Sequence, residues 1–87
     1  MSNRIPLIAG NWKMHKTGSQ AGEAASQLKR LVEKATDVEV MIAPTHTALY
    51  QVVQALKGSA IALGAQNLYW EKQGAFTGEI SSEMLVD

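Results

Sequence analysis

Near the start of the chain stands the stretch Ala9-Gly10-Asn11-Trp12-Lys13-Met14-His15. It follows an apolar run and precedes a helical pattern that begins at Thr17, so it marks the carboxyl end of a β-strand. Side chains alternate along a strand, so we expect Asn11 and Lys13 to point to one face and Trp12 to the other. Ligands bind at this end of the strands in parallel α/β folds. Lys13 could then neutralise an anion, while Asn11 donates a hydrogen bond or orients the lysine.

Composition limits what the chain can be and what it can bind. Its 87 residues allow one domain, and 46% hydrophobic with 18% charged residues is typical of a globular protein. The formal net charge is +0, which provides no basic field to attract nucleic acid or an anionic membrane. The absence of cysteine excludes disulfides, thiolate zinc sites and cysteine nucleophiles. His15 and His46 have no carboxylate at a matching spacing, so we expect no metal site. We recognise no signal peptide or spanning segment and expect a soluble cytoplasmic protein.

Hydrophobic periodicity predicts alternating strands and helices. Strands are expected at residues 5–9, 38–43 and 60–65, because each is a short apolar run. After the first strand, a capping box of Thr17 and Gln20 opens a helix with an apolar stripe of Ala21, Ala24, Ala25, Leu28, Leu31, Val32 and Ala35. A second helix, capped by Thr45 or Thr47, ends at Lys57-Gly58 and carries Ala48, Leu49, Val52, Val53 and Leu56. Strands joined by such crossovers run parallel, which predicts an α/β fold with a buried sheet.

A long irregular segment, residues 66–78, follows the third strand. Its length exceeds that of an ordinary strand-to-helix loop, which indicates a functional or partner-binding role. The segment contains four large apolar side chains, which a protein does not leave facing water: Leu68, Tyr69, Trp70 and Phe76. They could fold back onto this chain, but three strands and two helices offer little core, so we expect docking onto a neighbour. Residues 80–87 are typical of a helix start capped by Ser81, and we expect the chain to continue beyond them.

Two of these segments resemble one enzyme family. Residues 9–14, Ala-Gly-Asn-Trp-Lys-Met, are similar to the end of the first strand of triosephosphate isomerases. Residues 64–67, Gly-Ala-Gln-Asn, together with residues 74–81, Gly-Ala-Phe-Thr-Gly-Glu-Ile-Ser, resemble the third loop of that family. The resemblance covers essentially the whole chain. It implies a (β/α)₈ barrel, a fold of about 250 residues, of which residues 1–87 would form the N-terminal portion of a single domain. That portion comprises strand, helix, strand, helix and strand, then the long loop and the start of a third helix.

The resemblance also implies functions for individual residues. The family interconverts glyceraldehyde 3-phosphate and dihydroxyacetone phosphate, and we expect no cofactor. Asn11 and Lys13 match the substrate contacts of the family, whereas the glutamate base, the histidine electrophile and the lid would lie beyond Asp87. The third loop of the family inserts into the opposite subunit of a homodimer. The residues that would form this interface are Met14, Thr45, His46, Gln66, Phe76, Thr77, Gly78 and Glu79.

The same residues allow other interpretations. A lysine after a strand is usually solvated, and an asparagine there is usually a turn former. Residues 10–17 nearly match a phosphate-binding P-loop, but His15 stands where the motif requires glycine. A different class of function is a non-catalytic structural fragment, or one that completes a barrel with another chain. Such a fragment could be a truncated part of a longer protein, an engineered fragment, or one chain of a split enzyme, and the sequence is compatible with all three.

Overall fold

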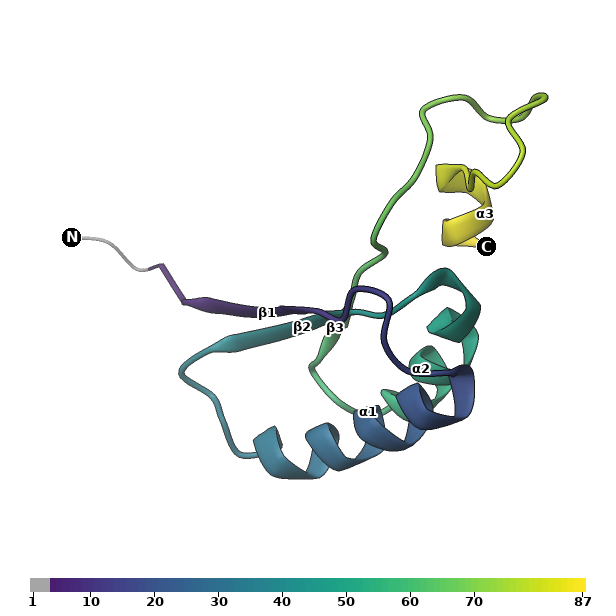
Figure 1. The fold of residues 1–87 in the computed structure, drawn as a ribbon. Coiled ribbons are helices and arrows are strands. Elements are labelled where there is room, and N and C mark those ends of the chain that lie inside the picture. The colour runs from purple at the N-terminus through teal and green to yellow at the C-terminus, as the bar shows by residue number, and fades with distance from the viewer. Residues whose placement is uncertain (1–3) are drawn as a thin grey trace.

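A computed structural model describes residues 4–87 as a three-stranded parallel sheet with helices packed on one of its faces (Figure 1). The chain runs through β1 (Leu7–Asn11), α1 (Gly18–Val32), β2 (Glu39–Ala43), a 3₁₀ turn η1 (His46–Ala48), α2 (Leu49–Ala55), β3 (Ala62–Leu63) and α3 (Ser82–Val86). The sheet order is β1-β2-β3, so both helical crossovers join neighbouring strands. The predicted parallel α/β arrangement is confirmed for this three-strand portion.

Strand β1 is more exposed than the sequence predicted. Among the described residues it pairs only with β2, in a register that sets Leu7 opposite Glu39 and Asn11 opposite Ala43. Pairing begins at Leu7, but Leu7 and Ile8 are each 57% exposed. The prediction of a buried first strand was wrong, because a strand at the edge of a sheet has a neighbour on one side only.

Helix α1 follows its predicted signals closely at its start and less closely at its end. The capping box is present: the Gln20 amide donates to Thr17 Oγ1 at 3.3 Å, and the Thr17 amide donates to Gln20 Oε1 at 3.0 Å. The helix ends at Val32, about one turn before Ala35, the last residue of the predicted apolar stripe. Leu31, which the stripe placed inward, is 82% exposed.

Helix α2 begins differently from the prediction. Thr45 precedes the 3₁₀ turn η1 in an extended conformation but makes no capping hydrogen bond with its side chain. Its hydroxyl instead lies 3.2 Å from the hydroxyl of Thr47. Helix α2 ends at Ala55, before the predicted end at Lys57-Gly58, and Gly58 adopts a left-handed φ of 82° in the turn that follows. The Lys29 ammonium from α1 donates to the carbonyl of Lys57, which ties the two helices together.

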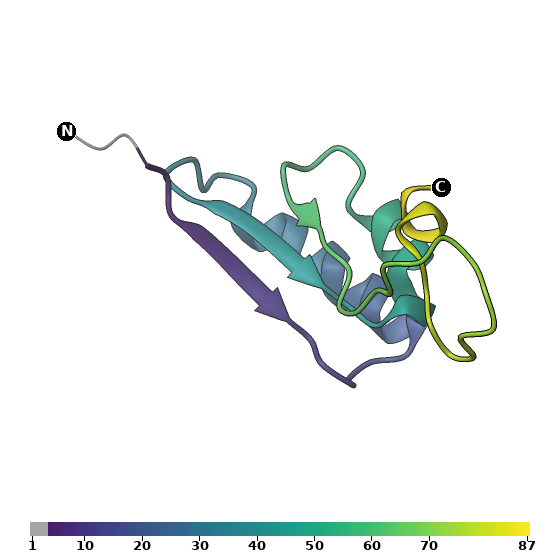
Figure 2. The ribbon, with the colours of Figure 1, turned by 90° about the horizontal axis from the view of Figure 1, so that it is seen from above.

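The core lies between the sheet and the two longer helices. Figures 1 and 2 show α1 and α2 on the same side of the strands. Small residues on α1 allow close packing against β2 and α2, and the buried cluster consists of Ala21, Ala25, Ile42, Ala48, Val52 and Leu56. The opposite face of the sheet carries no helix of the described chain. The sheet is thus covered on one face here, not on both.

Beyond β3, the chain leaves the body of the molecule (Figure 1). Strand β3 is only two residues long, shorter than the predicted run. Tyr69 and Ser81 form a single parallel bridge that closes the base of the long loop, and the Ser81 hydroxyl accepts from the Met84 amide at 3.3 Å to cap α3. Within residues 4–87, no helix combines the length and the apolar character needed to cross a membrane.

Candidate functional site at the carboxyl ends of the strands

The candidate site is built at the end of β1, where the strand turns toward α1. Asn11 is the last residue of β1 and is exposed. Trp12 follows it, donates its amide to the Ala43 carbonyl at 3.1 Å and packs against the buried core. Trp12 therefore anchors the end of β1 to the core. It fixes the point from which the next residue leaves the sheet.

Lys13 does not continue the strand. Its φ is 56°, in the left-handed region that non-glycine residues rarely occupy. Alternation along a strand therefore does not place its side chain, contrary to the expectation that Asn11 and Lys13 share a strand face. Asn11 acts on the lysine through the backbone instead: its Oδ1 accepts from the Lys13 amide at 2.9 Å. This short-range bond is typical of asparagine at turns and stabilises the unusual backbone.

Gln66 fixes the other side of Lys13. Its Nε2 donates to the Lys13 carbonyl at 2.9 Å and to the Ala43 carbonyl at 2.9 Å. One side chain from the segment after β3 thereby joins the ends of β1 and β2. Lys13 is held through both its amide and its carbonyl, while its side chain is exposed. Sequence reasoning placed Gln66 at a subunit interface and did not find this contact within the chain.

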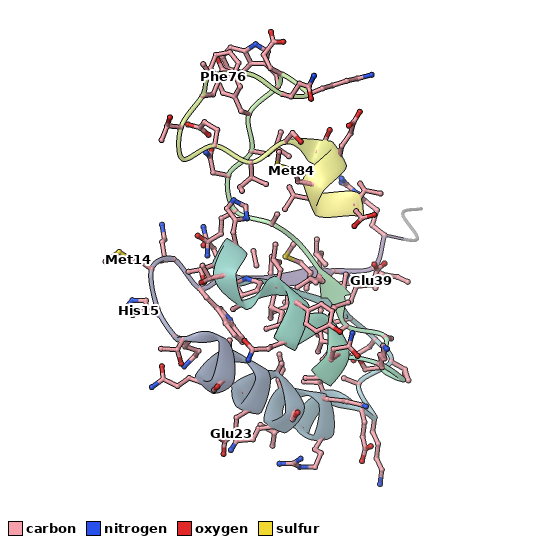
Figure 3. The ribbon with its side chains drawn as sticks, turned by 90° about the vertical axis from the view of Figure 1, so that its right-hand side faces the viewer. Met14, His15, Glu23, Glu39, Phe76 and Met84 are labelled. Carbon is pink, nitrogen blue, oxygen red and sulfur yellow. The ribbon has the colours of Figure 1, made fainter. Side chains whose placement is uncertain are left out.

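The residues expected at an interface outside the long loop lie in two places. Met14 is 92% exposed on the β1–α1 loop, and Figure 3 shows it and His15 projecting outward. Thr45 and His46 lie just after β2, where His46 is partly buried. Its Nδ1 atom is buried with no hydrogen-bond partner among the described residues.

The long loop is a closed unit with its own packing. The Tyr69 ring stacks on Trp70 with centroids 4.1 Å apart and contacts Phe76 at 4.5 Å. Asn67 Nδ2 donates to Glu79 Oε1 at 3.3 Å, and Gly78 adopts a φ of 89°. The aromatic side chains pack on one another and not on the core, and Trp70 remains 79% exposed. Phe76 lies at the far end of the loop from Met14, so this chain does not bring the two halves of the expected interface together (Figure 3).

Comparison with known proteins identifies the family to which the chain belongs. A family model described as triosephosphate isomerase matches residues 6–87. The chain belongs to the triosephosphate isomerase family. The triosephosphate isomerases of Geotalea uraniireducens and Geobacter metallireducens are each 52% identical over 84 residues, and that of Citrifermentans bemidjiense is 46% identical over the same length. Each alignment covers 97% of this chain and 34% of the relative, so the chain spans about a third of the length of the curated relatives it matches.

Membership of the triosephosphate isomerase family agrees with the resemblance found in the two motifs. The three parallel strands are consistent with a part of the barrel of this family, and no complete barrel is present in residues 4–87. Within the same residues, no group of three or more histidine, aspartate or glutamate side chains is arranged to hold a metal ion.

Proposed function

We propose that this chain supplies the first part of a single barrel domain in a cytoplasmic triosephosphate isomerase, the enzyme that interconverts glyceraldehyde 3-phosphate and dihydroxyacetone phosphate. Asn11 and Lys13 bind the substrate in this proposal. The observation that carries it is the restrained backbone of Lys13. Its amide donates to Asn11 Oδ1 and its carbonyl accepts from Gln66 Nε2, each at 2.9 Å, while its side chain stays exposed. A cation on so restrained a backbone is suited to hold an anion in a defined place.

The chemistry of the reaction gives Lys13 its role. Removal of a proton from the carbon beside the substrate carbonyl places negative charge on the carbonyl oxygen. A positioned ammonium stabilises that developing charge and also attracts the phosphate dianion. Asn11 uses Oδ1 to accept from the Lys13 amide, which leaves its Nδ2 group to donate to the substrate.

Substitution of Lys13 tests this assignment. The barrel can be completed as a chimera in which residues 1–87 are continued by the remaining two thirds of the Geotalea uraniireducens relative. In this chimera, Lys13→Ala should lower kcat/KM by at least 100-fold, because an electrostatic contact to developing charge contributes about 3 kcal/mol. Lys34→Ala is the matched control, since Lys34 is an exposed lysine beyond the end of α1. A Lys13→Ala chimera as active as the control would refute the assignment.

We further propose that residues 66–78 form an interface with a second copy of the chain, together with Met14, Thr45, His46 and Glu79. The exposed aromatic side chains and the projection of the loop from the body support this. Phe76→Asp should convert a dimer into monomers in sedimentation experiments, because a charge is poorly tolerated in a desolvated contact. Thr77→Arg is a second variant that leaves the aromatic packing intact, and Thr36→Arg, on the exposed α1–β2 connection, is the control. A dimer unchanged in both loop variants would show that the loop is not the interface.

The second candidate function is a non-catalytic fragment that completes a barrel with another chain. The edge of β1 away from β2 has no partner strand within residues 4–87, and this favours it, because an uncovered parallel strand needs a neighbour. The resemblance places the base and the electrophile beyond Asp87, so the 87-residue chain alone should not catalyse the reaction. An intact mass of the protein isolated from its source would separate a short chain from part of a longer one.

A further inference from the structure

The loop between β1 and α1 contains a second residue with a left-handed backbone. Lys16 has a φ of 75°, and its ammonium lies over the indole ring of Trp12, 5.7 Å from the ring centroid. A left-handed backbone at a residue with a side chain costs about 1 to 2 kcal/mol. Glycine would remove this cost but would provide no cation. The backbone strain at Lys16 therefore coincides with a specific side-chain contact, that of its ammonium with the Trp12 ring.

Trp12 and Lys16 enclose the segment that contains Lys13. On one side, Trp12 is fixed by the hydrogen bond that its amide donates to the Ala43 carbonyl at 3.1 Å and by packing against the core. On the other side, Lys16 precedes the capping box of Thr17, which anchors the chain to α1. The contact between the Lys16 ammonium and the Trp12 ring spans these two fixed points and closes the loop. The residues between them, including Lys13, are exposed.

We propose that Lys16 is a positioning residue for Lys13: by resting its ammonium on Trp12, it holds the loop in the one shape that presents the Lys13 ammonium at the end of β1. This inference rests on the proposed function of Lys13. Lys16 itself does not touch the substrate in this account, because its charge lies on the face of the indole. Its influence on the reaction passes through the backbone of residues 13–15.

Three substitutions of Lys16 in the barrel chimera separate positioning from stability. Lys16→Met removes the cation and keeps the backbone strain, Lys16→Gly removes both, and Lys16→Arg keeps both. Methionine and glycine should each lower kcat/KM about threefold to fivefold, the factor that an exposed cation–π contact is worth, while arginine should keep it within about twofold of the parent. The glycine variant should nevertheless unfold at a temperature equal to or above that of the parent, because it relieves the strain at φ 75°. Loss of activity without loss of stability is the result that a merely structural role would not give.

A double substitution tests whether Lys16 acts through Lys13. In a Lys13→Ala background, Lys16→Met should cause no further loss of kcat/KM, because the group being positioned is gone. Equal losses in both backgrounds would mean that Lys16 contacts the substrate directly and would overturn the proposal. So would parent-like activity in the methionine and glycine variants, or an arginine variant as impaired as methionine. Lys34→Met is the control for loss of a lysine charge.

A measurement on the 87-residue chain itself keeps this proposal distinct from the proposed function. Protons next to the Lys16 ammonium should show an upfield NMR shift from the indole ring current, and Lys34 should not. Absence of that shift would overturn the Trp12–Lys16 contact whatever Lys13 does. If the shift is present but Lys13→Ala leaves turnover unchanged, the proposed function fails and the positioning role fails with it, while the contact stands.

Discussion

Replacing Gln66 with methionine should loosen the end of β1, because it removes both Nε2 hydrogen bonds and keeps a side chain of similar length. Each bond measures 2.9 Å, and a bond of this kind contributes about 1 kcal/mol to the stability of the folded state. The Ala43 carbonyl still accepts from the Trp12 amide at 3.1 Å, and Lys13 is exposed, so its carbonyl can return to water. Neither carbonyl is left buried without a partner. We therefore expect the free energy of unfolding to fall by about 1 to 2 kcal/mol.

The same substitution should impair turnover more than it impairs folding. Without Gln66, the left-handed backbone of Lys13 keeps the hydrogen bond at its amide but loses the one at its carbonyl, so the ammonium is held less firmly in its position. In the barrel chimera we expect kcat/KM to fall about tenfold, which corresponds to roughly 1.4 kcal/mol. Urea unfolding followed by tryptophan fluorescence measures the first effect, and a coupled assay measures the second. Gln54→Met, on the exposed side of α2, is the matched control. If the Gln66 and Gln54 variants were indistinguishable in both measurements, the two Gln66 hydrogen bonds would have no energetic role.

Two further predictions concern the scaffold. Thr17→Ala should lower the free energy of unfolding by about 1 kcal/mol through loss of the capping box, whereas Thr36→Ala, which caps no helix, should leave it nearly unchanged in the same urea titration. Val52→Ala should cost about 2 kcal/mol because Val52 is fully buried, and the neighbouring, more exposed Val53 should tolerate the same change better; equal losses at the two positions would contradict the core described here.

The scaffold was largely predictable because its signals are local. The capping box of Thr17 and Gln20 and the glycine at position 58 depend on neighbouring residues, and both appear as expected. The buried side of α1 also followed from periodicity, since Ala21 and Ala25 lie in the core. Burial of β1 was mispredicted because it depends on which elements cover the strand. An apolar run in the sequence does not show which helices or strands will cover it in the fold.

The sequence singled out the end of β1 as a candidate site but did not predict its geometry. Asn11 and Lys13 stood out from their place after an apolar run, yet no local pattern indicates that Lys13 adopts a left-handed backbone. The Gln66 contact spans 53 positions in the sequence, so only the meeting of two strand ends brings it into reach. An amide residue directly after the third strand was the one available signal. Lys16 gave no signal either, because its contact with Trp12 depends on the path of the loop.

The most direct test of the account is a complementation assay with separate chains. The 87-residue chain and a fragment containing the rest of the Geotalea uraniireducens relative are assayed for dihydroxyacetone phosphate formation, alone and mixed. We predict no turnover from either chain alone, turnover from the mixture, and its loss when the 87-residue chain carries Lys13→Ala but not when it carries Lys34→Ala. Turnover by the 87-residue chain alone, or a mixture that remains fully active with Lys13→Ala, would contradict the claim that this chain supplies the substrate-holding part of the isomerase and not the whole of it.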